Sequence, residues 1–398
     1  MTTGLNLFLI AAGGLVLAVV LLFAIEILAA VTRRRAPAPA SATRPALAIL
    51  MPAHQEARGI AATLAALLPQ LAPGDRLLVV ADNCTDDTAA LARAAGAEVV
   101  ERTDPVRRGK GYALDFGLSH LAAAPPPVVV IVDADCTLRP GSLDVLARTV
   151  NARGRPVQGL YLMAAPPGAG LGLKVAELAF LVKNRVRPLG LHRLGLPCQL
   201  TGTGMAFPFA TLREAKLASA HLVEDMRLGL DLALDGSPPL FCEAARIDSE
   251  FPVSEAGVAS QRQRWEEGHL GMIAFALPRL PAALARGRVG AVALILDMLV
   301  PPLTLLLLAT LAVFGLAALA TLLFALPGLA LGLATLALVL LGLAVVAAWT
   351  GFGRAVLTPR EAVQVVPFLA RKLALYARLA TGSRAGGWVR TDRSGKDG

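Results

Sequence analysis

Long apolar stretches stand near both ends of the chain, and short apolar runs alternate with polar segments between them. The first long stretch, residues 5–31, is broken only by Asn6 and Glu26, and the other two, residues 303–325 and 328–350, are separated by Pro327-Gly328. A helix of about 20 apolar residues can cross a bilayer. A cleaved signal peptide is the alternative for the first stretch, but the run is too long and no Lys or Arg precedes it. The pattern predicts a transmembrane anchor at 1–31 and two transmembrane helices at 303–350.

Between the spans, the apolar runs at 46–51, 77–81, 99–100 and 128–132 read as buried strands, and the segments at 57–71, 88–95 and 110–121 have helical spacing. Strands that alternate with helices indicate an α/β domain with a mostly parallel sheet, which we assign to residues 46–265. Ligands of such sheets bind beyond the carboxyl ends of the strands. Three acids, Asp82, Asp133 and Asp135, directly follow strands.

The net charge of +9 over 398 residues is concentrated beside the spans. The Pro/Ala-rich linker at 32–45 carries +4 and the segment 354–398 carries +6, whereas residues 46–353 are neutral overall. A nucleic-acid-binding protein would carry the excess on its folded domain, so that class is excluded. Basic flanks prefer the cytoplasm, which places the α/β domain and the tail at 351–398 inside. Residues 266–302, with Asp297 and Pro301-Pro302, read as interfacial helices; Glu26 is interpreted as snorkelling to the membrane surface.

The strand-end acids suggest a metal site, although each has a structural alternative. Asp133 and Asp135 offer two oxygen donors of the kind that Mg²⁺ or Mn²⁺ takes while it also holds a diphosphate. An Asp-x-Asp in this position is also common as a solvated turn or helix cap. In the segment 82–88, Asp87 or Thr85 is expected to cap the helix that follows, and Asp82 is the stronger site candidate.

Three further motifs combine charge with a turn or a helix face. Residues 108–112 (RGKGY) suit a phosphate-facing loop without P-loop spacing, or are simply a basic loop. Glu224-Asp225 either opens a helix whose dipole favours acids or supplies a general base. Gln261, Arg264 and Trp265 share one face if residues 261–265 are helical, and an interfacial Trp/Arg belt is the alternative.

Together these motifs resemble the membrane-bound family 2 glycosyltransferases, the GT-A group that contains the synthases of cellulose, hyaluronan, chitin and poly-N-acetylglucosamine. The resemblance covers roughly residues 46–290, extends to Trp388-Val389-Arg390-Thr391, and rests on six motifs in one order: Asp82 in VVADNCTDDT, GKGYAL at 109–114, Asp133-Ala134-Asp135, GTGMAF at 202–207, Glu224-Asp225 and Gln261-x-x-Arg264-Trp265. It implies a GT-A, Rossmann-like, mostly parallel sheet domain with three flanking transmembrane helices.

The resemblance also implies roles on the donor side of the site. Glu56, in the segment where the family often has PxHNE, would lie near the nucleotide, and Asp82 would contact the base. Lys110 would lie near the diphosphate. Asp133 would bind the ribose and Asp135 the divalent metal, Mg²⁺ or Mn²⁺, that bridges the diphosphate.

On the acceptor side, the resemblance makes Asp225 the catalytic base. Gln261, Arg264 and Trp265 would hold the acceptor sugar and the leaving diphosphate. Gln-x-x-Arg-Trp favours processive synthesis, whereas Val223, where many polymerising members have Thr, argues against it.

The implied function is inverting, metal-dependent transfer from a nucleotide sugar, expected to be a UDP-sugar, to a glycan or lipid-linked acceptor at the cytoplasmic face of the plasma or inner membrane. Processive synthesis and single transfer both remain open, and dimers or partner subunits could complete an export channel. A non-catalytic scaffold subunit of an export complex is the alternative, but it predicts lost acids. A transporter is disfavoured because the spans contain no paired charges or repeat.

Overall fold

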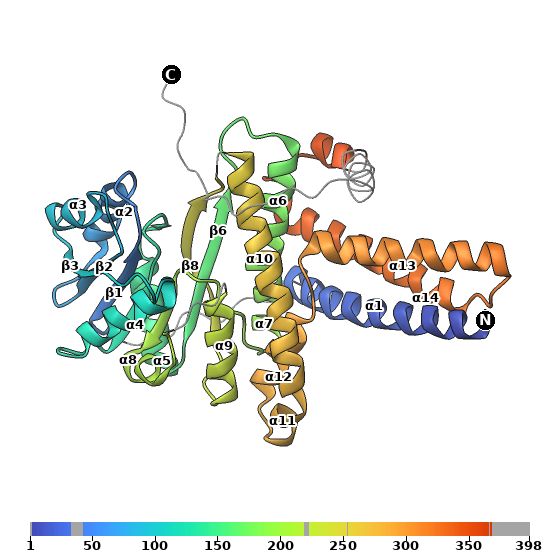
Figure 1. Cartoon of the computed structure of the whole chain (residues 1–398), viewed down its shortest axis with the longest axis horizontal. Coiled ribbons are helices and arrows are strands. Elements are labelled where there is room, and N and C mark those ends of the chain that lie inside the picture. The colour runs from blue at the N-terminus through green and yellow to red at the C-terminus, as the bar shows by residue number, and fades with distance from the viewer. Residues whose placement is uncertain (1, 33–42, 219–222, 253, 366, 368–398) are drawn as a thin grey trace.

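The computed structural model describes residues 2–32, 43–218, 223–252, 254–365 and 367. Its centre is an eight-stranded sheet in the order β3-β2-β1-β4-β7-β6-β8-β5 (Figure 1). The strands are β1 (Leu47–Ala53), β2 (Arg76–Asp82), β3 (Glu98–Arg102), β4 (Val128–Ile131), β5 (Thr137–Leu138), β6 (Val157–Ala164), β7 (Met205–Pro208) and β8 (Leu240–Glu250). Neighbours are parallel except where β7 pairs with β4 and β6 and where β5 pairs with β8. The predicted mostly parallel sheet is confirmed, and its first four strands are those predicted.

Helices cover both faces of the sheet, because its central strands are apolar on both sides. One face packs against α2 (Ile60–Leu67), α3 (Thr88–Ala94) and α5 (Ser142–Arg153). The other face packs against α4 (Lys110–Leu121), α8 (Phe209–Glu214) and α9 (Glu224–Leu234). This three-layer core holds the carboxyl ends of β1, β2 and β4 and the first turns of α4 and α9 in fixed positions.

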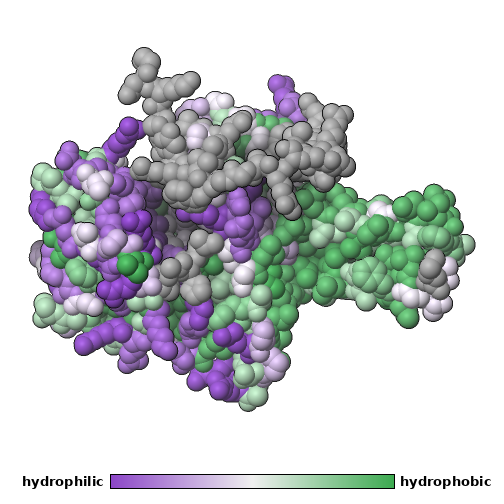
Figure 2. All heavy atoms as spheres, in the orientation of Figure 1, coloured by the Kyte–Doolittle hydropathy of each residue, from purple (hydrophilic) through white to green (hydrophobic). Residues whose placement is uncertain are grey.

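Three apolar helices extend together away from this domain: α1 (Thr2–Val31), α13 (Leu303–Phe324) and α14 (Leu329–Ala348). The N-terminus and the α13–α14 turn lie at the far end of the bundle (Figure 1), so the opposite ends of all three helices adjoin the sheet domain. Figure 2 shows a continuous apolar surface over the bundle. Large exposed side chains on it include Leu7, Leu15, Leu28, Leu316, Leu322 and Leu343. Such a surface is typical of helices in contact with lipid.

Within the described part of the chain, four helical segments, rather than three, are long and apolar enough to cross a membrane. The fourth, Gly257–Ala285, contains most of α10 (Glu255–Ala276), the short turn η3 (Leu277–Arg279) and α11 (Leu280–Ala285). Unlike the bundle, α10 runs alongside the sheet domain (Figure 1) and packs against α9 and α12 (Val289–Met298). Most of this segment falls in the range that the sequence analysis interprets as interfacial.

The remaining connections link the sheet to the bundle. After β6, the chain forms α6 (Leu171–Leu181), a π-helical turn η2 (Val182–Val186) and α7 (Arg187–Arg193). After α14, the turn η4 (Trp349–Gly353) leads to a segment that returns to α6, where Glu361 forms an ion pair with Lys174 at 2.5 Å. Arg33–Arg35, most of the basic tail and Trp388–Thr391 lie outside the described residues.

A buried charge network joins the anchor to the domain. The Arg187 guanidinium binds Glu26 of α1 at 2.6 Å and Asp297 of α12 at 2.5 Å. Gln199 donates a hydrogen bond to the other Asp297 oxygen at 2.9 Å. Glu26 therefore does not snorkel: its side chain is buried, with a partner on a helix 161 residues further along the chain. Gly190 makes the approach possible, because a Cβ there would lie 1.9 Å from the Glu26 carbonyl oxygen.

Replacing Arg187 should loosen the anchor. In Arg187→Met two buried carboxylates would lose their counter-charge, which typically costs about 3–5 kcal/mol of stability. We expect a clearly lower thermal unfolding midpoint in detergent, measured by intrinsic fluorescence. Arg185→Gln is the matched control, because its ion pair with Glu243 is about one-third exposed and contributes about 1 kcal/mol or less. Equal midpoints for the two variants would contradict a structural role for the network.

Candidate active site

A cavity of about 220 Å³ lies at the carboxyl ends of β1, β2 and β4, beside the first turn of α4. All five residues that the sequence analysis assigns to the donor side line it: Glu56, Asp82, Lys110, Asp133 and Asp135. They come from chain positions up to 79 residues apart and meet because parallel strands bring their carboxyl ends to one edge of the sheet. Their placement agrees with the expectation, and their roles remain predictions.

Lys110 is the positive centre of this cavity. Its Nζ lies 2.5 Å from Asp133 Oδ1 and donates a hydrogen bond to the Gly202 carbonyl oxygen at 2.8 Å. Burial alone would lower the pKa of Lys110, but the charges of Asp133 and Glu224 outweigh burial and raise the pKa above its usual value. The ammonium therefore stays charged at neutral pH, as binding of a diphosphate requires.

Glu224 and Asp225 open α9 and line a neighbouring cavity, which Gly111 and Leu114 of α4 also line. The Gly202 backbone lies close to both Asp225 and Lys110: a Cβ there would lie 3.3 Å from Asp225 Oδ2 and 3.5 Å from Lys110 Nζ. Burial raises the pKa of Asp225, opposed chiefly by Lys110. Burial and the neighbouring Asp225 raise the pKa of Glu224 to about 7. Carboxyl groups with raised pKa values are suited to proton transfer near neutral pH.

Asp82 has a partner that the sequence analysis missed. Arg102, the last residue of β3, donates to Asp82 Oδ1 at 2.6 Å, and Asn83 donates to the same oxygen at 3.0 Å. His54 Nδ1 hydrogen-bonds to the Asp82 backbone oxygen at 2.7 Å, so this histidine connects the end of β1 to the end of β2. Arg102 ends a parallel strand beside β2, which is the signal that could have revealed it.

The cap of α3 differs from the expectation. Neither Asp87 nor Thr85 caps the helix; the Asp86 carboxylate instead accepts from the Thr88 backbone N–H at 3.1 Å and from the Thr88 hydroxyl at 2.5 Å. Its other oxygen accepts from the Ala57 N–H at 3.1 Å. Asp86 therefore links the two loops at the rim of the cavity.

The donor atoms of Asp133, Asp135 and Cys136 lie within 4.8 Å of one another. Burial raises the pKa of the Cys136 thiol well above its usual value, and the thiol donates to Asp135 Oδ1 at 3.4 Å. A protonated thiol is a poor metal ligand, so the donor set is two carboxylates. Carboxylate oxygens, with positions left for phosphate and water, fit Mg²⁺ or Mn²⁺ rather than a thiolate-bound metal.

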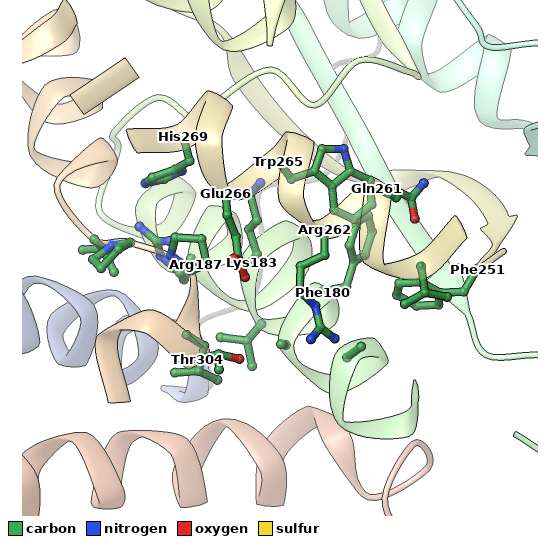
Figure 3. Close-up of a pocket in the computed structure, with 18 of the residues that line it drawn as sticks. Phe180, Lys183, Arg187, Phe251, Gln261, Arg262, Trp265, Glu266, His269 and Thr304 are labelled. Carbon is green, nitrogen blue, oxygen red and sulfur yellow. The ribbon is translucent and has the colours of Figure 1, made fainter. Parts of the chain in front are cut away.

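The three motif residues on α10, Gln261, Arg264 and Trp265, do not share one environment. Gln261 and Trp265 line a second cavity of about 120 Å³ (Figure 3), where the Trp265 ring packs 5.6 Å from the Phe180 ring. Arg264 is exposed and does not line that cavity. It lies one helical turn before Gly268, which packs against Val223 at the start of α9. The structure thus brings Gln261 and Trp265 together and leaves Arg264 apart from them.

A family model described as glycosyltransferase like family 2 matches residues 45–268. The chain belongs to this family. The match spans the sheet domain and every residue that lines the first cavity.

Curated relatives share part of this transferase. An "uncharacterized glycosyltransferase" of Mycobacterium tuberculosis (strain ATCC 25618 / H37Rv) is 37% identical over 123 residues, which cover 29% of this chain and 52% of the relative. The 4,4'-diaponeurosporenoate glycosyltransferase of Staphylococcus aureus (strain NCTC 8325 / PS 47) is 34% identical over 113 residues, 27% of this chain and 29% of the relative. The transferase thus matches about half of the mycobacterial relative and less of the staphylococcal one.

A mannosyltransferase of Pyrobaculum calidifontis, solved with GDP-mannose and Mn²⁺, has a similar fold. Its TM-score is 0.52 at 18% identity, over 88% of this chain and 98% of that one. The similarity confirms the predicted GT-A fold.

Gly202 offers a test of the site that leaves its charges unchanged. Its φ of +88° disfavours any other residue, and a methyl group would crowd Asp225 Oδ2 at 3.3 Å and contact Lys110 Nζ at 3.5 Å. We expect Gly202→Ala to lower kcat about 10²-fold, the scale typical of an ångström-sized misplacement. Gly168→Ala is the control, with φ of +80° and nothing within 4 Å of the added carbon. Equal sugar-transfer rates would show that the Gly202 turn does not position the site.

Proposed function

We propose that the protein transfers a sugar, with inversion at the anomeric carbon, from a UDP-sugar to a hydroxyl group of a glycan or lipid-linked acceptor at the cytoplasmic face of the membrane. One observation carries the proposal: Lys110 forms an ion pair with Asp133 and, at Gly202, lies close to Asp225, so a donor phosphate and a general base would meet at one point. Family membership supports a nucleotide-sugar donor.

The reaction follows from these positions. The acceptor hydroxyl oxygen bonds to the anomeric carbon while the bond from that carbon to the diphosphate breaks. Asp225 accepts the hydroxyl proton, and Lys110 offsets the charge that develops on the leaving diphosphate. Asp82 and Glu56 contact the nucleoside at the far side of the cavity. Mg²⁺ or Mn²⁺, held by Asp135 and beside Asp133, would supply further charge neutralisation when bound.

A single displacement explains the proposed inversion. One carboxylate activates the acceptor on the face opposite the leaving group, and no nucleophilic side chain is needed. A scaffold subunit without activity would have no need for this set of acids and lysine. Its retention favours an enzyme over the alternative of a degenerate export subunit.

The geometry of the bundle supports the proposed membrane placement. Each of the three bundle helices has one end beside the sheet domain, so the domain occupies a single side of the bilayer. Basic flanks at 32–45 and 354–398 favour the cytoplasm for that side. Three bundle helices are few for a secretion channel within one chain, so we propose single transfer; processive synthesis would need further subunits.

The transfer rate should depend on pH through the buried acids. Asp225 must be unprotonated to act as base, and burial raises its pKa. The rate is therefore full above the raised pKa and falls about tenfold per pH unit below it. We expect kcat/KM to begin falling at a higher pH than an ordinary aspartate would give, and the neighbouring Glu224 takes up its own proton near pH 7. Glu224→Gln should shift the fall to lower pH, and a flat profile from pH 5 to 8 would contradict the assignment.

The direct test of the proposed function is nucleotide release. Membranes that contain the full chain are incubated with Mg²⁺ or Mn²⁺ and either UDP-sugars or GDP-mannose. The released nucleoside diphosphate, UDP or GDP, is then measured. We expect UDP release with at least one UDP-sugar and its loss when EDTA is added. Release from no donor in the presence of membrane lipids would refute the proposal, and release from GDP-mannose alone would refute UDP as the carrier.

A further inference from the structure

The second cavity lies between the catalytic domain and the membrane helices. Its lining comes from α1, α6, η2, α10 and the segment that leads into α13. It shares no residue with the cavity that holds Asp82, Lys110 and Asp133. A site for a second substrate is therefore available beside the bilayer, apart from the donor.

The walls that face the bundle are apolar. Phe23 belongs to the buried part of α1, Ala179 and Phe180 lie on α6, and Leu303 opens α13. They come from the part of α1 near its C-terminal end, from α6 and from the start of α13. Figure 2 shows that the surface changes from apolar to polar where the bundle meets the domain. A hydrocarbon chain could enter here from the bilayer and stay in apolar surroundings.

Charged groups occupy the other side of the cavity. The side chains of Arg262 and Glu266 extend from α10 into the cavity. The Lys183 side chain, from η2, lies beside Glu266 (Figure 3). Arg187 also lines the cavity, but Glu26 and Asp297 satisfy its charge. Among the described residues, neither Lys183 nor Arg262 forms an ion pair, and Glu266 is the one carboxylate in the cavity lining. The cavity thus keeps an excess positive charge over apolar walls.

Lys183 connects this cavity with the proposed base. Burial lowers the pKa of Lys183, and Asp225 is close enough to oppose that effect. The charge of Lys183 in turn opposes the effect of burial on the pKa of Asp225. Gly268 of α10, which precedes the cavity residue His269, packs against Val223, two residues before Asp225, so a head group bound at Lys183 would lie on the side of the cavity near the proposed base.

We propose that this cavity binds the acceptor and that the acceptor is a lipid with an acidic head group. Its chain lies against Phe23, Phe180 and Leu303, its acidic group lies between Lys183 and Arg262, and a neighbouring hydroxyl faces Asp225. This inference rests on the proposed function and adds the class of acceptor. A phosphate and a carboxylate would both satisfy the two cations.

The test measures lipid binding without turnover. The full chain in nanodiscs of uncharged phosphatidylcholine binds a fluorescent 12-carbon probe that ends in phosphate, and dodecyl phosphate, dodecanoate and dodecanol compete for it. We expect an acidic competitor to bind at least about tenfold tighter than dodecanol, on the scale of a charge-assisted hydrogen bond. Preference for dodecyl phosphate or for dodecanoate identifies the acid. If dodecanol competes for the probe as strongly as both acids do, the proposal is wrong.

Variants assign the binding to this cavity. Lys183→Gln and Arg262→Gln should each weaken the acidic competitor about tenfold and change dodecanol less than twofold. Ala179→Trp, which fills the apolar side, should weaken all competitors. Arg286→Gln, at an exposed arginine that follows α11, should change none. Unchanged acidic binding in both charge variants would overturn the assignment.

Failure of this inference can be told apart from failure of the proposed function. UDP binding with Mn²⁺, measured on every variant, shows that the donor site is folded. If lipid binding shows the expected pattern but no donor is ever turned over, the proposed function fails and the lipid site stands. If UDP is released but lipid binding ignores charge, only the inference about the acceptor fails.

Discussion

Asp225→Asn should abolish sugar transfer while leaving the donor bound. Asparagine keeps the shape of the side chain but cannot accept the acceptor proton, and loss of a general base typically costs about 10²–10⁴-fold in rate. We expect kcat to fall by this amount in a UDP-release assay. The Kd for UDP with Mn²⁺ should change little, because Asp225 does not line the cavity that holds Asp82, Asp133 and Asp135.

The control for this variant is Asp235→Asn, at the exposed far end of the same helix. It removes the same charge from α9 at a position away from Lys110 and Gly202, so its transfer rate should equal that of the wild type. If the turnover of Asp225→Asn stays within tenfold of the wild type, Asp225 is not the general base, and Glu224 becomes the candidate.

Asp135→Ala should lose metal-dependent donor binding. It removes one of the two carboxylates that fit Mg²⁺ or Mn²⁺, and even the loss of an outer-shell partner weakens metal binding about 10–100-fold. We expect calorimetry to show UDP affinity at least about 100-fold weaker with Mn²⁺, and no further loss on adding EDTA.

Asp115→Ala tests whether the effect is specific to the strand end. Asp115 is exposed on α4, the helix that carries Lys110, and does not line the donor cavity. Its UDP affinity should match the wild type. If Asp135→Ala also binds UDP normally, Asp133 and Asp135 are turn residues rather than a metal site.

The sequence predicts well those elements that are apolar on both faces or begin at a turn. The run at 128–132 becomes β4, and the predicted helix at 110–121 coincides with α4. The later strands were missed for physical reasons. β6 is interrupted by Gly159, and β8 carries Glu243, Arg246 and Asp248, so their strand character depends on pairing with each other.

The residues of the candidate site likewise include some that the sequence could place and some that it could not. Asp82, Asp133 and Lys110 stand next to predicted elements, so the order of strands and helices was enough to place them together. Arg102 was missed because the third strand was recognised only at Val99-Val100. Glu26 was misread, because its partners Arg187 and Asp297 come from distant segments that only the folded chain brings together. The cavity beside Trp265 likewise forms only when α1, α6 and α10 pack.

The central claim is that Asp82, Lys110, Asp135 and Asp225 surround one bound donor. The measurement that tests it most directly is an experimental structure of Asp225→Asn with a UDP-sugar and Mn²⁺, with the metal located by anomalous scattering. We predict the Mn²⁺ signal at Asp135, the diphosphate beside Lys110 and the base beside Asp82. A nucleotide bound elsewhere, or Mn²⁺ away from Asp133 and Asp135, would contradict the account.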